Sequence, residues 1–136
     1  MKLAVEESTD ALKKSLNDGL RDFNEAAMPD TATNAYVVTL RDDDGALQGG
    51  IIAQVHGESC YFATVWTADA VRGTGFGTKL MAAAEDEARR LGTHGVWLYT
   101  TSFQAKPFYE KLGYSEFAEL KWRGSTVLRH FVRKDL

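Results

Sequence analysis

The sequence predicts an α/β (α+β) fold with a mixed, mostly antiparallel central sheet, and two observations carry this prediction. Three β-rich runs follow one another between residues 35 and 67, separated only by short turns. An amphipathic segment at 78–91 then precedes a short apolar run at 96–99. Strands joined by tight turns pair antiparallel, whereas a strand reached through a helical crossover pairs parallel. We therefore expect both halves to share one mixed sheet.

Size and composition favour a single domain spanning residues 1–136. Of the 136 residues, 44% are hydrophobic and 26% are charged, which is typical of globular proteins. A chain of this length builds one hydrophobic core. The single cysteine, Cys60, has no partner for an internal disulfide.

Charge and hydropathy exclude two classes of partner. The formal net charge is −3, whereas nucleic-acid binding depends on neutralising phosphates with basic side chains. No run approaches the roughly 18 apolar residues that cross a bilayer, and the N-terminus lacks the apolar stretch of a secretory signal. We expect a cytoplasmic protein with neither nucleic acid nor membrane as a partner.

The first elements are a short strand at 2–6 and a helix that one of Ser8, Thr9 and Asp10 can cap. The helix is predicted because apolar residues recur at helical spacing. These residues are Leu12, Leu16, Leu20, Phe23 and Ala27. The run Asn17-Asp18-Gly19 lowers helix propensity, so two shorter helices are an alternative.

Three strands come next, at 35–41, 47–55 and 60–67. Asp42-Asp43-Asp44-Gly45 separates the first two and carries an Asp-Gly hairpin signal. These strands should form an antiparallel meander.

The helix at 78–91 places Leu80, Ala84, Ala88 and Leu91 on one face, while Glu85 is among the charged residues elsewhere. Gly92 should end this helix.

A buried parallel strand is expected at 96–99. A second helix at 102–112 carries Pro107 near its first turn and stops at Gly113. Strands at 115–121 and 125–133 close the chain.

A glycine-rich turn, Arg72-Gly73-Thr74-Gly75-Phe76-Gly77, connects a strand to a helix. Glycine permits positive φ angles and lets an anion approach the backbone, and free N–H groups at a helix start attract negative charge. The turn should hold a phosphate or pyrophosphate.

Two nucleotide-binding motifs do not fit this turn. A dinucleotide fingerprint needs G-x-G-x-x-G and an acidic residue after the next strand, where Tyr99 and Thr100 stand instead. A P-loop needs G-K-[ST], and Gly77-Thr78-Lys79 has a different order.

The pattern that does fit is [RQ]-x-x-G-x-[GA], met by Arg72, Gly75 and Gly77. A second motif, F-Y-x-x-x-G-[FY], is met by residues 108–114, Phe108-Tyr109-Glu110-Lys111-Leu112-Gly113-Tyr114. With both motifs at this separation, the chain resembles the GNAT family of N-acetyltransferases over nearly its whole length.

The resemblance implies a sheet of about six or seven strands with helices on both faces. The sheet would splay beside the strand ending near Thr67, and acetyl-CoA would bind in the opening as co-substrate. The expected cofactor-binding residues are Val65, Trp66 and Thr67 for the pantetheine arm, Arg72, Gly73, Thr74, Gly75, Phe76, Gly77 and Thr78 for the pyrophosphate, and Ser102 and Phe108. Many relatives carry asparagine in place of Ser102, so that contact is a departure, although serine can still cap the following helix.

The same resemblance implies direct acetyl transfer to a primary amine, with Tyr109 as the general acid that protonates the departing thiolate. Tyr61 stands where some relatives carry a glutamate base, which leaves the base unassigned. His56 and Glu58 are candidates, although strand periodicity favours solvated side chains for both, and a water chain is the alternative.

The acceptor is expected to be a small-molecule or peptide amine. By analogy with related proteins, Phe23 and Asn24 would contact it, with a core position the alternative for Phe23. The same analogy implies a homodimer. A non-catalytic acyl-CoA-binding sensor is the alternative function.

Other reactive side chains receive structural interpretations. Cys60 should pack as a small hydrophobe, because no motif places a histidine beside it. His94 and His130 are expected at the surface, and no histidine and carboxylate spacing suggests a metal.

Overall fold

A computed structural model describes residues 1–27 and 33–136 and divides the chain into two compact units, Met1–Thr31 and Ala32–Leu136. The single-domain organisation inferred from chain length stays a prediction.

The first unit contains one helix, α1 (Asp10–Ala27). Thr9 is the capping residue, because its Oγ1 accepts a hydrogen bond of 3.3 Å from the Leu12 N–H. The helix continues through Gly19 without a break, and ion pairs from Asp18 to Lys14 and Arg21 bracket the weak position. The predicted strand at 2–6 is wrong, because this segment has no regular secondary structure.

No side chain of α1 is buried. The apolar stripe exists as predicted, but its members are exposed, and Phe23 is 71% exposed. This exposure is that of the first unit by itself, so the alternative of a core position for Phe23 stays a prediction.

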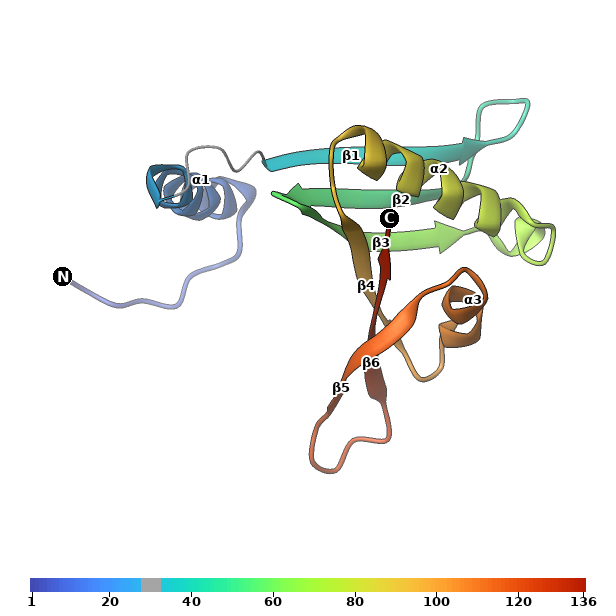
Figure 1. The fold of residues 1–136 in the computed structure, drawn as a ribbon. Coiled ribbons are helices and arrows are strands. Elements are labelled where there is room, and N and C mark those ends of the chain that lie inside the picture. Colours follow the sequence, from blue (N-terminus) through green and yellow to red (C-terminus); the bar gives the residue numbers. More distant parts are fainter. Residues whose placement is uncertain (28–32) are drawn as a thin grey trace. The chain divides into compact units, whose positions relative to one another are not determined.

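The second unit is built on one six-stranded sheet with the order β1-β2-β3-β4-β6-β5 (Figure 1). Only the β3–β4 pairing is parallel, so the mixed, mostly antiparallel sheet is confirmed. The strands are β1 (Thr33–Arg41), β2 (Leu47–His56), β3 (Ser59–Thr67), β4 (Gly95–Thr101), β5 (Ser115–Lys121) and β6 (Leu128–Asp135).

The β1–β2 hairpin forms where the Asp-Gly signal predicts it. Gly45 takes a positive φ of 84°, and the Asp42 carboxylate accepts hydrogen bonds from the N–H groups of Ala46 and Asp44. These hydrogen bonds hold the pKa of the Asp42 carboxyl below its usual value, and the bond from Ala46 is the largest cause.

Helix α2 (Phe76–Arg90) connects β3 to β4 and packs on β1 and β2 (Figure 1). It buries Leu80, Met81, Ala84 and Ala88, and Gly92 takes a positive φ of 80° just beyond its end, as predicted. One assignment on this helix is wrong, because Glu85 is buried among the apolar residues instead of exposed.

Helix α3 (Lys106–Lys111) is shorter than the predicted 102–112. The first residues of that range form a turn, in which the Gln104 side-chain oxygen accepts a hydrogen bond of 2.9 Å from the Thr101 N–H. The helix begins one residue before Pro107, because proline tolerates only the first turn of a helix.

Candidate functional site

The strands β3 and β4 separate soon after they meet. Their parallel pairing covers three registers and ends at Tyr61 opposite Trp97. From there β4 continues along β6 up to Thr101, while residues 62–67 of β3 pair only with β2. We call the stretch in which β3 (62–67) and β4 (98–101) run without pairing to each other the splay. The splay that the family resemblance implies is therefore present.

A β-bulge in β3 marks the start of the splay. Ile52 of β2 lies opposite Thr64, whereas the next residue of β2, Ala53, lies opposite Phe62, which leaves Ala63 as an extra residue in β3. A bulge bends its strand and increases the local twist. Backbone N–H and C=O groups on the free side of residues 62–67 therefore face a side without a strand partner, where a ligand with amide groups can pair with them.

Val65, Trp66 and Thr67 form the end of β3 in the splay. They pair with Ile51, Gly50 and Gly49 of β2. A Cβ atom at residue 49 would lie 2.9 Å from the Trp66 carbonyl oxygen, so the strand pairing requires glycine there. Sequence reasoning did not single out Gly49, although two glycines in succession within a strand were a signal.

The glycine-rich turn follows β3 through a short 3-10 helix, Asp69–Val71. Gly73 and Gly75 take positive φ angles of 75° and 88°, and α2 begins at Phe76. The first backbone bond that reaches back from α2 is Lys79 N–H to Gly75 O, at 3.2 Å.

In the residues that precede Lys79, several backbone N–H groups have no hydrogen-bond partner among the described residues. They are those of Gly73, Gly75, Phe76, Gly77 and Thr78. The first turn of α2 also contains no acidic side chain. Free N–H groups at a helix start attract anions, so this turn can hold a phosphate group.

Arg72, the first residue of the turn, forms an ion pair outside the turn. Its guanidinium pairs with Asp69 at 2.8 Å, and both side chains are exposed. An exposed pair of this kind contributes little to stability, so the arginine can exchange its partner for a phosphate at small cost.

Tyr109 on α3 is 7% exposed. Its ring lies edge-on to those of Phe108 and Tyr114, with centroid distances of 5.2 and 5.9 Å. Its hydroxyl makes no hydrogen bond within the described part of the chain, and burial raises its pKa to about 12. The phenol is therefore protonated at neutral pH and free to donate.

Phe108 connects α3 to the glycine turn. A Cβ atom at Gly77 would lie 3.4 Å from the Phe108 ring. The residue before Tyr109 therefore contacts the first turn of α2.

Ser102 holds the loop after β4 and does not cap α3, which corrects one expectation. Its N–H donates to the Leu128 O at 2.8 Å, and its Oγ accepts from the Leu128 N–H at 3.2 Å. Beside it, the Thr101 Oγ1 is buried and has no hydrogen-bond partner in the described ranges. Nothing in the sequence pattern identified Thr101.

The candidate bases differ in their surroundings. His56 and Glu58 are exposed, as their strand positions predicted. Tyr61 stacks on Trp97 with ring centroids 4.2 Å apart, and burial raises its pKa, so it is protonated at neutral pH. Cys60 is fully buried, and burial raises the pKa of its thiol, which confirms its packing role.

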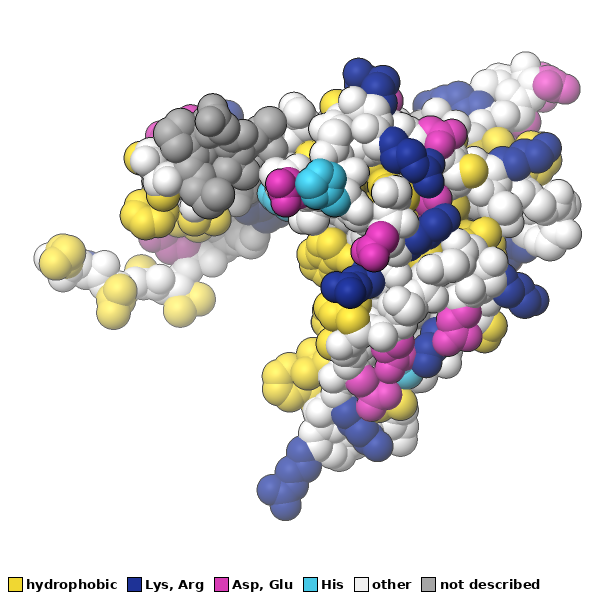
Figure 2. All heavy atoms as spheres, in the orientation of Figure 1, with side chains coloured by type: hydrophobic (Ala, Val, Ile, Leu, Met, Phe, Trp, Pro, Cys, Tyr) yellow, Lys and Arg dark blue, Asp and Glu magenta, His cyan; other side chains and the backbone are white. Residues whose placement is uncertain are grey.

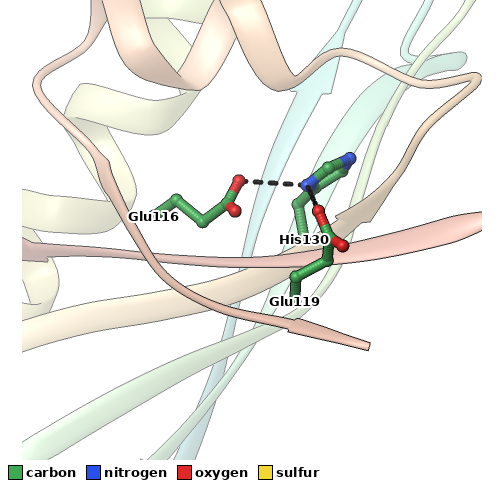
Figure 3. A group of neighbouring side chains, drawn as sticks. All are labelled: Glu116, Glu119 and His130. Carbon is green, nitrogen blue, oxygen red and sulfur yellow. Dashed lines mark hydrogen bonds and ion pairs between the residues drawn. The ribbon is translucent and has the colours of Figure 1, made fainter. Parts of the chain in front are cut away.

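A cluster of Glu116, Glu119 and His130 joins β5 and β6 (Figure 3). The His130 Nδ1 lies 3.0 Å from Glu116 and 3.8 Å from Glu119. His130 is buried, which corrects the predicted surface position. Lys106 also contacts the Glu116 carboxylate at 2.6 Å and is the main cause of its lowered pKa. These groups could ligate a cation, but Lys106 already neutralises Glu116, and the expectation of no metal stays a prediction.

The predicted acceptor residues, Phe23 and Asn24, lie on α1 in the first unit, and their contact with a substrate stays a prediction.

Acidic and basic side chains are interspersed on the face drawn in Figure 2. Across the described ranges, every helix is too short or too polar to cross a membrane.

Comparisons with known proteins agree with this geometry. The sequence model described as the acetyltransferase (GNAT) family matches residues 4–114. An acetyltransferase from Agrobacterium fabrum is 30% identical over 108 residues, which cover 79% of each chain. Blasticidin-S acetyltransferase from Streptomyces morookaense is 32% identical over 102 residues, or 74% of this chain and 75% of the relative.

Solved structures share the fold. A crystal structure of an Agrobacterium tumefaciens protein assigned as an acetyltransferase superposes over 100% of both chains with a TM-score of 0.89 and 27% identity. A Bacillus anthracis protein assigned as a streptothricin acetyltransferase, solved in complex with acetyl coenzyme A, is 19% identical with a TM-score of 0.69, covering 76% of this chain and 63% of the other. The fold, the glycine turn and the family match lead to one conclusion: the chain belongs to the GNAT family of acetyl-CoA-dependent N-acetyltransferases.

Proposed function

We propose that this enzyme binds acetyl-CoA in the splay and transfers its acetyl group directly to the primary amine of a small molecule. The observation that carries the proposal is that β3 and β4 stop pairing after Tyr61 and Trp97. The cofactor arm would pair with the free backbone of residues 65–67. The pyrophosphate would lie on the N–H groups of residues 73–78, with Arg72 beside it.

The reaction needs a neutral amine. An alkyl amine with a pKa of about 10.4 is neutral in roughly one molecule in 2,500 at pH 7, so removing its proton matters. The nitrogen lone pair attacks the thioester carbonyl carbon, a C–N bond forms, and the C–S bond breaks. We propose that the amine loses its proton to water, with no side chain assigned as the base.

Tyr109 would complete the reaction as general acid. Its hydroxyl is protonated at neutral pH, since burial raises its pKa to about 12, and it has no partner among the described residues to compete for its proton. It would donate that proton to the thiolate of coenzyme A and recover one from solvent.

A small-molecule acceptor is supported by the Streptomyces relative, whose name states that it acetylates blasticidin S. The acceptor of this enzyme would be an amine of the same broad class. Phe23 and Asn24 would contact it, and Ser102 and Phe108 would support the cofactor.

Release of coenzyme A thiol in the presence of a panel of amines tests the proposal. We expect amine-dependent release, and Tyr109→Phe should lower kcat by about 10²-fold or more while leaving the Kd for acetyl-CoA within twofold. Acetyl-CoA at 100 times its Kd should add about 2.7 kcal/mol to the free energy of unfolding. Binding without amine-dependent thiol release would defeat the catalytic proposal.

A further inference from the structure

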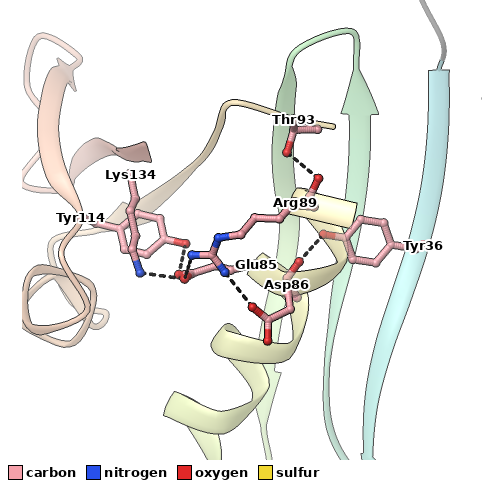
Figure 4. A network of polar contacts seen from close by, with 9 residues as sticks. Tyr36, Glu85, Asp86, Arg89, Thr93, Tyr114 and Lys134 are labelled. Carbon is pink, nitrogen blue, oxygen red and sulfur yellow. Dashed lines mark hydrogen bonds and ion pairs between the residues drawn. The ribbon is translucent and has the colours of Figure 1, made fainter. Parts of the chain in front are cut away.

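Glu85 is a buried carboxylate on α2 with both oxygens occupied (Figure 4). The Tyr114 hydroxyl donates to Oε1 at 3.0 Å, and the Lys134 Nζ donates to Oε2 at 2.7 Å. Arg89 approaches the same oxygen at 3.7 Å. The side chain is only 4% exposed, in a helix face that otherwise carries apolar residues.

Tyr114 connects this carboxylate to Tyr109. Its ring lies edge-on to the Tyr109 ring, with centroids 5.9 Å apart and an interplanar angle of 70°. Its backbone N–H donates to the Tyr109 carbonyl oxygen at 3.1 Å. The hydrogen bond to Glu85 fixes the rotation of the Tyr114 side chain, and that side chain is one wall of the space in which the Tyr109 ring lies.

A buried ion is costly, and an apolar side chain of similar volume often stabilises a fold as well or better. Hydrogen bonds differ from apolar contacts in being directional. The contacts from Glu85 through Tyr114 to Tyr109 therefore orient the two tyrosine rings, which a leucine at position 85 would not do.

We propose that Glu85 is a positioning residue for acetyl transfer, which acts through the Tyr114 hydroxyl to hold the ring of Tyr109 at the angle that aims its hydroxyl at the thiolate. The inference rests on the proposed role of Tyr109 as general acid. Glu85 itself touches neither cofactor nor acceptor in this proposal.

A double-mutant cycle in the full chain tests it, with thiol release measured at saturating acetyl-CoA and amine. Tyr114→Phe keeps the ring and removes only the hydroxyl. We expect it to lower kcat about tenfold, because small misplacements of a catalytic group cost up to about 10²-fold, and to leave the Kd for acetyl-CoA within twofold. In a Tyr109→Phe background the same change should cause no further loss. An equal loss in both backgrounds would overturn the inference.

Tyr36→Phe is the matched control. The Tyr36 hydroxyl donates to the Ala84 carbonyl oxygen at 2.6 Å, on the same helix and one residue from Glu85 (Figure 4). Its other polar neighbour among the described residues is the Cys60 Sγ, at 3.6 Å. This variant should lose stability with little change in kcat. A tenfold fall in its kcat would show that any loosening of α2 lowers kcat, and would count against a specific effect of Glu85 through Tyr114.

Variants at Glu85 give a second readout. Glu85→Gln keeps an oxygen for Tyr114 and should retain kcat within about threefold, whereas Glu85→Leu should match Tyr114→Phe. Equal losses in the two variants would exclude the hydrogen-bonded route. Different results contradict the two proposals. An unchanged kcat in Tyr109→Phe would contradict the role of Tyr109 as general acid. If Tyr109→Phe does lower kcat, but the losses from Tyr109→Phe and Tyr114→Phe are additive, only the role of Glu85 is contradicted.

Discussion

The rings of Tyr61 and Trp97 stack with centroids 4.2 Å apart at the last register where β3 and β4 pair. The stack lies on two strands that separate immediately beyond it. The stack therefore lies at the narrow end of the splay, and we expect its loss to lower stability and to weaken cofactor binding.

Trp97→Ala should lower the free energy of unfolding by about 2 kcal/mol, somewhat less than a fully buried tryptophan would. Urea unfolding followed by circular dichroism measures the change. Trp122→Ala is the control, because Trp122 is 69% exposed in the turn after β5, and surface changes stay within about 0.5 kcal/mol. Equal effects of both variants would contradict a structural role for the stack.

Gly75→Ala should raise the Kd for acetyl-CoA at least tenfold and cost about 1–2 kcal/mol of stability. Gly75 has a φ of 88° at the start of α2, and alanine is strained in that region. The displaced backbone would move the N–H groups that are proposed to bind the pyrophosphate.

Gly124→Ala is the control for the predicted change in the Kd for acetyl-CoA. Gly124 has a φ of 79° in the β5–β6 turn, with nothing within 4 Å of an added Cβ, as at Gly75. The two variants should lose similar stability, but only Gly75→Ala should weaken binding. A tenfold change of Kd in Gly124→Ala would mean that general strain, not the glycine turn, controls affinity.

Gly49→Ala should weaken acetyl-CoA binding severalfold, because the added Cβ would lie 2.9 Å from the Trp66 carbonyl oxygen and push β3 at the residues proposed to pair with the cofactor arm. Calorimetric titration with acetyl-CoA measures this. Gly19→Ala, in α1 with open space around it, should leave the affinity unchanged and add up to about 1 kcal/mol of helix stability. Unaltered affinity in Gly49→Ala would remove the pairing proposal for residues 65–67.

Stability should fall as the pH rises from 10 to 12. An unfolded tyrosine ionises near pH 10, whereas burial raises the pKa of Tyr109 to about 12. The unfolded chain therefore loses this proton first, and a contribution of about 2–3 kcal/mol that is fully present below pH 10 disappears as the pH passes 12.

Burial also raises the pKa of Tyr36 and Tyr114, so their contributions have the same sign. Tyr109→Phe lacks the Tyr109 contribution, and its free energy of unfolding should fall less steeply over this range. Identical pH slopes for the parent protein and the variant would show that Tyr109 ionises normally.

Much of the fold follows from local patterns. Alternating β-rich runs predicted β1, β2 and β3 to within two residues at each end, and the Asp-Gly signal predicted the hairpin between β1 and β2. Helix α2 was expected two residues too late, because Phe76 and Gly77 belong to both the glycine turn and the helix. The glycine spacing with the Phe108 and Tyr109 motif indicated the family, since both motifs are read from contiguous residues.

Other features required the assembled sheet. The strand expected at 2–6 is absent because a strand needs a partner, which its own residues do not specify. His130 alternates along β6 like any polar strand residue, yet Glu116 from the neighbouring strand covers it.

The sequence by itself determined the order of the elements from the first helix onward, the glycine-rich turn and the family, because hydrophobic period and glycine placement act over a few neighbouring residues. Tertiary structure alone decided that Glu85 is buried, since its partners Tyr114 and Lys134 are 29 and 49 residues away. It also decided where the splay begins, because the last β3–β4 pair and the Ala63 bulge depend on pairing between distant strands. Long-range pairing of this kind leaves no local pattern in the chain.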